Sequence, residues 1–149
     1  MRRTMWVCVA LVSCAAPGAS PADARREIGE QLARSARDWN RGDLDGFMAD
    51  YARDSMTGYV VRGHVQYGWQ ALYDSYQSRY FAPGKARDSL SFEEVAVRSL
   101  GPATAFATAR FALHRGDSLV ASGPFTIVLE KRAGGWLIVH DHSSSDPRP

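Results

Sequence analysis

Four strand-like stretches follow one another through the C-terminal half of the chain, and only tight turns join them. They cover residues 90–100, 103–115, 118–132 and 136–144. The connecting segments Gly101-Pro102, Gly116-Asp117 and Ala133-Gly134-Gly135 have the composition of hairpin turns. Because strands joined by short turns run antiparallel, the sequence predicts an antiparallel meander in this half of the molecule.

Three stretches with helical periodicity precede the meander. The first begins at Asp23, a good N-cap residue, and ends at Gly42, which suits the left-handed conformation that closes many helices. A second begins at Asp43 or Asp45, and a third covers about 66–80. Their apolar stripes are Ile28, Leu32, Ser35, Ala36 and Trp39; Leu44, Phe47, Met48 and Tyr51; and Trp69, Leu72, Tyr73, Tyr76 and Tyr80.

A short strand over 56–62 separates the second and third helices. Three helices before a curved antiparallel sheet predict an α+β domain in which the helices pack on one face of the sheet. The chain has 149 residues, of which 45% are hydrophobic, so one domain can bury a real core.

The N-terminus has the features of a secretory signal. Arg2 and Arg3 precede a short apolar run. The letters LVSC at 11–14 resemble the bacterial lipobox, in which the cysteine is lipidated. We therefore expect a signal peptide over 1–13, lipidation of Cys14, a flexible tether over 14–22 and a folded domain over 23–146. Cleavage by an ordinary signal peptidase, for instance after Ala16, is the alternative. Either route predicts a bacterial envelope location, facing the periplasm or the exterior.

Charge and cysteine content narrow the function. Loss of Arg2 and Arg3 leaves 16 basic residues against 16 acidic ones, so we expect no nucleic-acid partner and membrane contact only through the lipid. Both cysteines, Cys8 and Cys14, precede the domain. The domain therefore has no disulfide, no cysteine-bound zinc and no cysteine nucleophile. No phosphate-binding loop or other cofactor motif is present.

Two segments resemble the nuclear transport factor 2-like superfamily. The letters WNRGD at 39–43, followed by Phe47 and Tyr51, resemble its start. The letters GGWLIVHDHSS at 134–144 resemble the last strand of SnoaL-like domains and of the domain-of-unknown-function family 4440. They are also similar to the final strand of the association domain of type II calcium/calmodulin-dependent protein kinases.

This resemblance implies a cone-shaped roll, in which a strongly bent sheet wraps the helices and leaves a pocket at its open end. It also implies a homodimer through the outer face of the sheet. Members include ketosteroid isomerase, scytalone dehydratase, polyketide cyclases, limonene epoxide hydrolase and many non-catalytic binding modules. The fold alone therefore does not settle the function.

Asp141 is the candidate catalytic residue. Side chains alternate along a strand, so Asp141 and Ser143 share one face and His140 and His142 the other, unless a bulge intervenes. Resemblance to the association domain favours the face of Asp141 as the pocket side, because a pocket arginine of that family aligns with Ser143. In an apolar pocket, burial would raise the pKa of this carboxyl toward the range useful for acid–base catalysis. The alternative is a structural role, in which Asp141 bonds strand ends or pairs with Arg110.

Arg110 is predicted to bind ligand if it faces inward, because a buried arginine needs a carboxylate from Asp141 or from the ligand. Resemblance to the association domain supports this, since two further pocket arginines align with Arg110 and Ile127 and only Arg110 is retained. If Arg110 faces outward, it is a solvated or interface residue.

Aromatic residues form a second group of candidates. Trp39, Tyr51 and Tyr76 are predicted to line the pocket, while Trp69 and Tyr73 complete the cluster. Most such residues serve as core, but tyrosine hydroxyls in a cavity orient ligands. Asp54 lies near positions that carry catalytic acids in some relatives, although a turn role is favoured.

Histidines do not predict a metal site. His140 and His142 are two residues apart, but no third ligand is evident, with His64 and His114 as remote candidates. The preferred hypothesis is a lipid-anchored dimer that binds a small apolar or weakly acidic molecule. The alternatives are an isomerase, dehydratase or cyclase that uses Asp141 as general acid/base, and a module for envelope protein assembly.

Overall fold

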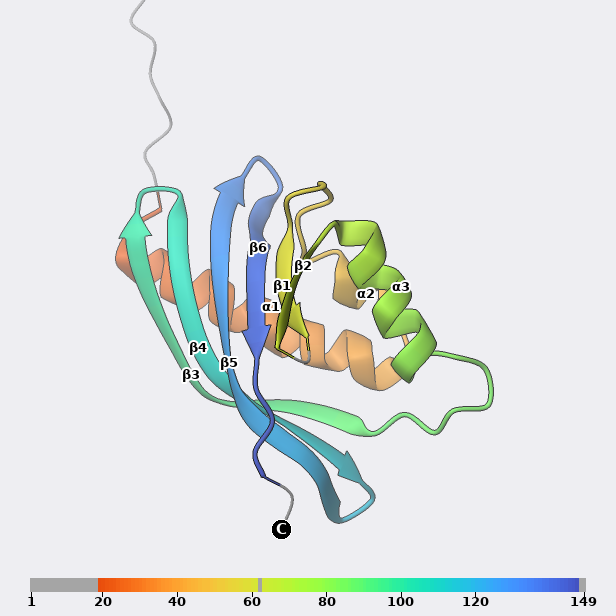
Figure 1. Cartoon of the computed structure of the whole chain (residues 1–149). Helices are drawn as coiled ribbons and strands as arrows, with labels where there is room; N and C mark the ends of the chain where they lie inside the picture. The colour runs from red at the N-terminus through yellow and green to blue at the C-terminus, as the bar shows by residue number, and fades with distance from the viewer. Residues whose placement is uncertain (1–18, 62, 148–149) are drawn as a thin grey trace, which may run out of the picture.

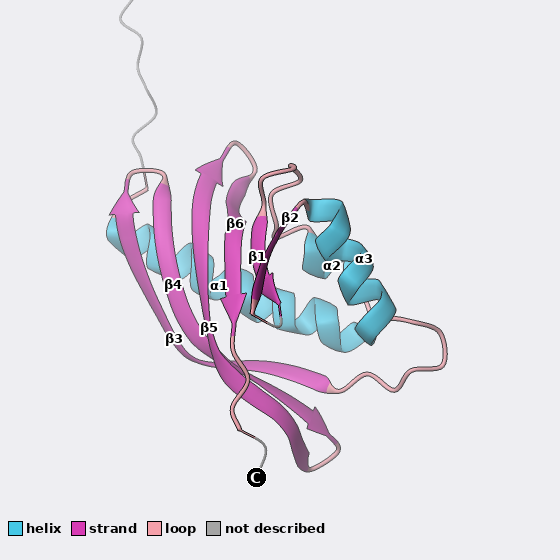
Figure 2. Cartoon of the chain, viewed as in Figure 1, coloured by secondary structure: helices cyan, strands magenta, loops and turns pink. Residues whose placement is uncertain are grey.

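A computed structural model describes residues 19–61 and 63–147. Figures 1 and 2 show a bent sheet wrapped around a long helix, with two shorter helices beside one end of the sheet. The elements, in chain order, are α1 Pro21–Arg41, α2 Leu44–Met48, β1 Gly58–Val61, β2 His64–Tyr67, α3 Trp69–Tyr80, β3 Ser89–Gly101, β4 Thr104–Arg115, β5 Ser118–Arg132 and β6 Gly135–Ser143. The α+β roll expected from the sequence is confirmed.

The sheet is mixed, which corrects the expected purely antiparallel arrangement. Its order is β2-β1-β6-β5-β4-β3, and β3 to β6 form the predicted antiparallel meander. Strand β1 runs parallel to β6. No turn joins β1 to β6, so no turn sets the direction of one strand relative to the other. The segment before β1 already runs beside β6, where the Ala52 N–H donates to the Ile138 carbonyl and the Ile138 N–H donates to the Asp50 carbonyl. The two halves of the chain therefore meet at β6.

The segment before α3 holds a strand that was not predicted. Strand β2 pairs with β1 as a hairpin, and α3 begins at Trp69 rather than near residue 66. Gly68 has φ 103°, a conformation that residues with a side chain rarely adopt. The backbone therefore changes conformation at Gly68, where β2 ends and α3 begins. Helical spacing of the aromatic residues predicted α3 itself correctly.

Helix α1 begins earlier than predicted. Ser20 is its N-cap, accepting a hydrogen bond from the Asp23 backbone N–H at 3.1 Å, and Pro21 occupies the first turn. Asp23 is therefore inside the helix, and the predicted tether over 14–22 overlaps its first residues. The expected signal peptide and Cys14 lie outside the described residues. Gly42 closes α1 in the left-handed conformation and Asp43 caps α2, as predicted.

Bulges bend the sheet. The β3–β4 register shifts between Glu93 and Ala96, where Glu94 has φ 53°, and Figure 1 shows β3, β4 and β5 curving near their middles. A bulge increases local twist and re-aims the side chains that follow it. The concave face holds the core, whose largest fully buried apolar side chains are Ile28, Met48, Ile127 and Leu129. Across the described residues, no helix has the length and apolar character to cross a membrane.

Candidate functional site

A bulge in β6 decides which side chains face the interior. Leu129 pairs with Ile138, and the adjacent Val128 pairs with His140, so Val139 is an extra residue on β6. Strict alternation would put Ile138 and Asp141 on opposite faces, but the bulge turns both inward. The inner set is therefore Trp136, Ile138, Asp141 and Ser143, which mixes the two sets expected from the sequence.

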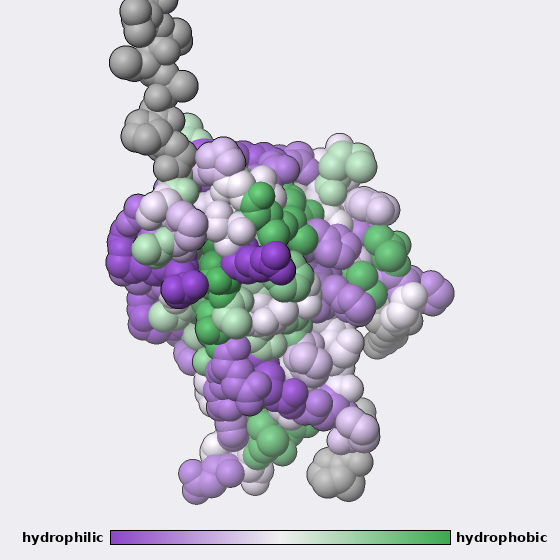
Figure 3. All heavy atoms as spheres, turned by 90° about the vertical axis from the view of Figure 1, so that its left-hand side faces the viewer, coloured by the Kyte–Doolittle hydropathy of each residue, from purple (hydrophilic) through white to green (hydrophobic). Residues whose placement is uncertain are grey.

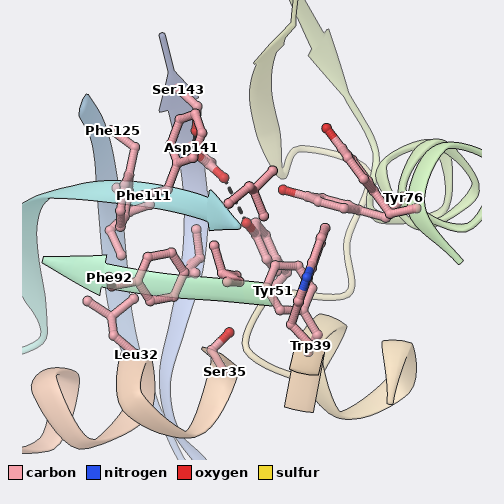
Figure 4. A pocket seen from close by; sticks show the side chains of 16 residues that line it. Leu32, Ser35, Trp39, Tyr51, Tyr76, Phe92, Phe111, Phe125, Asp141 and Ser143 are labelled. Carbon is pink, nitrogen blue, oxygen red and sulfur yellow. Dashed lines mark hydrogen bonds between the residues drawn. The ribbon is translucent and has the colours of Figure 1, made fainter. Parts of the chain in front are cut away.

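Two adjoining chambers lie between the concave sheet and the helices. The inner chamber has a volume of about 140 Å³ and the outer chamber about 530 Å³. Aromatic and aliphatic side chains from α1, α2, α3 and the four long strands form the inner wall (Figure 4). The outer chamber lies between α3, the β1–β2 hairpin and the chain after β6. A mostly apolar cavity with a few polar groups is the usual form of a small-molecule site.

Asp141 is the buried polar group at the junction of the chambers. Only 8% of the residue is exposed. The Tyr51 hydroxyl donates to Oδ2 at 2.7 Å and the Ser143 hydroxyl donates to Oδ1 at 3.2 Å (Figure 4). Burial raises the pKa of Asp141, while these two hydrogen bonds oppose the rise. This carboxyl therefore has neutral donors as its hydrogen-bond partners in the described structure, and it can accept from or donate to a ligand.

Two tyrosines extend this polar group. Burial raises the pKa of Tyr51 and of Tyr76, and the nearby charge of Asp141 raises both further. Both hydroxyls therefore stay protonated and act as hydrogen-bond donors at neutral pH. Trp39, Tyr51 and Tyr76 line the inner chamber, where the sequence placed them. Figure 4 shows Tyr76 reaching in from α3 toward Tyr51.

Arg110 does not reach the cavity, contrary to the sequence expectation. Its neighbours Ala109 and Phe111 face inward, so alternation along β4 turns Arg110 to the outer face. There it pairs with Asp146, which also accepts a hydrogen bond from Ser122 at 2.7 Å. No Asp141–Arg110 pair forms, and of the alternatives left open by the sequence the outward one is found.

The chain after β6 explains the position of Asp146. Backbone hydrogen bonds join Ser144 to Pro124 and Asp146 to Ser122, so this segment crosses β5 above Gly123. A Cβ on Gly123 would lie 1.8 Å from the Ser144 carbonyl oxygen, so only glycine allows this approach. No sequence pattern predicts this contact, because it depends on the bend of β5.

The remaining candidates lie outside the cavity. Trp69 stacks under Arg53, whose guanidinium carbon is 4.2 Å from the ring centre, and the Tyr73 hydroxyl donates to Asp45 at 2.9 Å. Asp54 accepts from the Met56 backbone N–H at 2.9 Å, which is the turn role favoured from the sequence. His140 packs against Gly58, where an added Cβ would lie 2.6 Å from Nδ1. Within the described residues, no three acidic, histidine or cysteine side chains are grouped to hold a metal.

Sequence reasoning missed most of the apolar wall. Leu90, Phe92, Phe111, Leu113 and Phe125 supply it from β3, β4 and β5. Period-two spacing within each strand groups these residues, but it does not say which face turns inward. Arg79, Tyr59 and Tyr80, which line the outer chamber, were also missed.

A second buried carboxyl, Asp50, lies outside the cavity. Only 4% of it is exposed, and Oδ1 accepts from Arg34 Nη2 at 2.6 Å. Oδ2 has no hydrogen-bond partner in the described structure. The Asp50 backbone carbonyl accepts from the Ile138 N–H, so this residue links the end of α2 to β6.

Comparison with known proteins agrees with this architecture. The family model of the SnoaL-like domain matches residues 28–147. The chain belongs to the SnoaL-like family. Its fold is that of the nuclear transport factor 2-like superfamily, as the sequence resemblance implied.

Solved structures with this fold include an NTF2-like protein of unknown function from Shewanella oneidensis, with a TM-score of 0.72 and 28% identity, over 80% of this chain and 97% of that one. An NTF2-like protein of unknown function from Pseudomonas putida has a TM-score of 0.70 and 19% identity, over 83% and 87%. An NTF2-like superfamily protein from Salmonella enterica has a TM-score of 0.68 and 19% identity, over 85% and 94%. No curated protein matches the chain.

Proposed function

We propose that this SnoaL-like protein is a secreted, lipid-anchored module that binds a small apolar or weakly acidic molecule in its cavity. The observation that carries the proposal is the pair of adjoining chambers with one buried carboxyl, Asp141, where they meet. Apolar walls supply most of the binding free energy, and a few placed polar groups select the ligand. Asp141, Tyr51 and Ser143 are the groups that would do so here.

Occupation of the inner chamber tests this function. Toluene is a suitable NMR titration probe, because its single ring matches the chamber in size. We expect saturable shifts at residues of the inner wall. Leu113→Trp fills the chamber and should abolish them, whereas Leu119→Trp, at a side chain that is 57% exposed, should not. If the wild-type protein shows no saturable shift, the proposal is wrong.

Lipid anchoring is tested at the two cysteines. The proposal predicts that Cys14→Ser releases the protein from the membrane fraction of a bacterial host. Cys8→Ser is the matched control, because Cys8 lies within the expected signal peptide. Continued membrane association of the Cys14 variant, with processing intact, would rule out the anchor and leave ordinary secretion.

We also propose that the protein is a homodimer through the outer face of the sheet. Phe106 and Val128 are paired across β4 and β5 and alternate with inward-facing, buried residues, so both point outward. Val128→Lys should convert the dimer to a monomer in sedimentation equilibrium, whereas Ser118→Lys at the far end of β5 should not. A wild-type monomer at micromolar concentration would contradict the proposal.

Catalysis is the second candidate function. The observation that favours it is a buried carboxyl 2.7 Å from a tyrosine hydroxyl inside a cavity, since a general acid/base needs both a shifted pKa and a reachable partner. An isomerase, dehydratase or cyclase reaction would use Asp141 to move the proton and a tyrosine to stabilise negative charge. Substitution by asparagine tests this role, as argued below.

Protein assembly is less well supported. A docking module exposes a large continuous apolar patch. Figure 3 shows the side of the molecule that carries β3, where apolar patches are interrupted by strongly hydrophilic side chains. The surface in this view therefore favours ligand binding over assembly as the main role.

A further inference from the structure

The two chambers adjoin in the interior of the molecule. Five residues line both of them: Tyr76, Tyr80, Phe111, Asp141 and Ser143. Asp141 therefore lies where the chambers adjoin and borders both of them. The walls differ in character, because the inner wall is mostly apolar, whereas the outer wall includes Arg79, His142 and the serines after β6.

The size of the inner chamber limits the apolar part of such a ligand. Its volume of about 140 Å³ is close to that of an engineered apolar cavity of about 150 Å³ that binds benzene. Phe92, Phe111 and Phe125 stand around it (Figure 4), and Phe92 and Phe125 have their ring centres 5.2 Å apart. These two rings pack against each other and form part of an aromatic wall, which suits an aromatic ring, and the volume admits one ring rather than two fused rings.

The outer chamber offers a cation. Arg79 is the only lysine or arginine among the described residues that line either chamber. It lies one helical turn from Tyr76 on α3, so the two side chains are neighbours on that helix. Arg79 lines the outer chamber together with Tyr59 of β1 and Tyr76 of α3, and its charge partly offsets the rise that burial causes in the pKa of both tyrosines.

Several other arginines in the described structure have partners of their own, although none of them lines either chamber. Arg87 lies over Phe81 and Arg53 over Trp69, and Arg34 and Arg115 pair with carboxylates. For Arg79, the described residues provide neither an ion pair nor an aromatic ring. A guanidinium prefers a carboxylate partner, which it can bind through two parallel hydrogen bonds.

We propose that the ligand is a single-ring arylalkanoic acid, with the ring in the inner chamber and the carboxylate in the outer chamber against Arg79. This inference rests on the proposed binding function and specifies its ligand class. A short chain between ring and carboxylate passes the junction, where Asp141 is available to a hydroxyl or carbonyl substituent. The carboxylate of the ligand thus contacts the guanidinium of Arg79, and its ring contacts the apolar wall of the inner chamber.

Two matched probes test the inference by isothermal titration calorimetry at low salt. 3-Phenylpropionate and 3-phenyl-1-propanol share ring and chain length and differ in charge. We expect the acid to bind about fivefold more tightly, the size of effect typical of a partly exposed ion pair. Arg79→Gln should remove this difference and leave the affinity for the alcohol unchanged. Arg87→Gln, at an arginine that lies over Phe81, is the control and should change neither affinity.

Ring size provides a second readout. 3-(2-Naphthyl)propionate carries the same acid but two fused rings, and it should bind more weakly than the phenyl compound despite its larger apolar area. Equal affinities for acid and alcohol in the wild type, or an acid preference that survives Arg79→Gln, would overturn the inference while the binding function stands. If neither phenyl probe binds the wild type, the inference fails, and the toluene titration decides separately whether the binding function stands. Thermal unfolding of each variant establishes that its fold is intact.

Discussion

Asp141 and Asp50 are both buried carboxyl groups, and they differ in their partners. Asp50 is paired with Arg34 at 2.6 Å, and about half of the Arg34 side chain remains exposed to water. Asp141 is held by the hydroxyls of Tyr51 and Ser143 and lines a cavity. Burial is the largest cause of the raised pKa at each residue. Only at Asp50 does a cation in direct contact oppose it.

This difference separates a structural role from a ligand-binding one. The Arg34 ion pair partly compensates the buried charge of Asp50, and the Asp50 backbone holds β6 beside the end of α2. Its carboxyl has no access to the cavity. Asp141 lacks such a compensating cation among its hydrogen-bond partners, so its burial costs stability that no ion pair recovers. Groups kept at such a cost concentrate in functional sites.

Both residues make stability depend on pH in the same direction. A carboxyl whose folded-state pKa lies above its unfolded value of 3.8 binds its proton more tightly in the folded state. Its contribution to stability is therefore fully present below pH 3.8 and is lost as the pH rises through the raised folded value. Substitutions at the two sites should change this dependence differently.

The largest effect is expected at the ion pair of Asp50. Arg34→Met leaves a buried carboxylate without its cation and should lower the free energy of unfolding at pH 7 by about 2 kcal/mol. Near pH 4 the loss should shrink, because Asp50 can then be protonated. Urea unfolding at both pH values measures this. Arg37→Met, at an exposed arginine on the same helix, is the control and should cost almost nothing. A loss independent of pH would contradict the ion-pair explanation.

The second-largest loss of stability is expected on removal of the Tyr51 hydroxyl. Tyr51→Phe removes the 2.7 Å hydrogen bond to Asp141 and should cost about 1.5 kcal/mol, as for other hydrogen bonds to charged acceptors. It should also raise the pKa of Asp141 further, because this bond stabilises the charged form. NMR titration of the carboxyl carbon follows that pKa. Tyr73→Phe removes a similar bond to Asp45 at the surface. Equal losses of stability in the two variants would contradict the expectation that the buried Tyr51–Asp141 bond contributes more than the surface Tyr73–Asp45 bond.

Asp141→Asn should raise the free energy of unfolding, in contrast to the two preceding substitutions. Asparagine keeps the shape and can still accept from Tyr51, but it removes a charge whose burial is uncompensated. We expect a gain of about 1 kcal/mol at pH 7 and a flatter pH dependence of unfolding. Toluene should still enter the inner chamber. If the protein is an enzyme, turnover of any substrate found should be abolished while folding stays intact. Unchanged turnover would exclude Asp141 as the general acid/base.

The contrast between the two carboxyls also shows what the sequence could predict. Helical spacing gave the aromatic wall from Trp39 and Tyr76, and turn chemistry gave the meander. Asp141 was identified from its place in a family-like last strand. Its inward direction depends on the extra residue Val139, which local propensity does not reveal. No sequence pattern identifies Asp50 as buried, because its burial arises from packing between α1 and β6, which are far apart in the sequence.

The prediction that Arg110 reaches the cavity was wrong for a related reason. A charged residue in the middle of a strand suggests a pocket, yet its partner Asp146 lies beyond the last strand, in a segment whose path depends on Gly123. Likewise, the parallel pairing of β1 with β6 is a non-local contact that no turn encodes. Periodicity thus predicts which residues share a face, and the bulges and crossings that choose the face require the folded chain.

Ser143 should show the smallest effect. Its hydroxyl donates to Asp141 at 3.2 Å, and the residue is exposed at the mouth of the cavity, so water can replace the bond in Ser143→Ala. The expected loss of stability is about 0.5 kcal/mol, at the low end for a hydrogen bond. The pKa of Asp141 should rise, though less than in the Tyr51 variant, because the Ser143 bond opposes the effect of burial less strongly. Ser145→Ala, at another serine of the outer chamber, is the matched control. A shift in the Ser143 variant larger than that from Tyr51→Phe would mean that the solvent-side bond, and not the buried one, sets the charge state of Asp141.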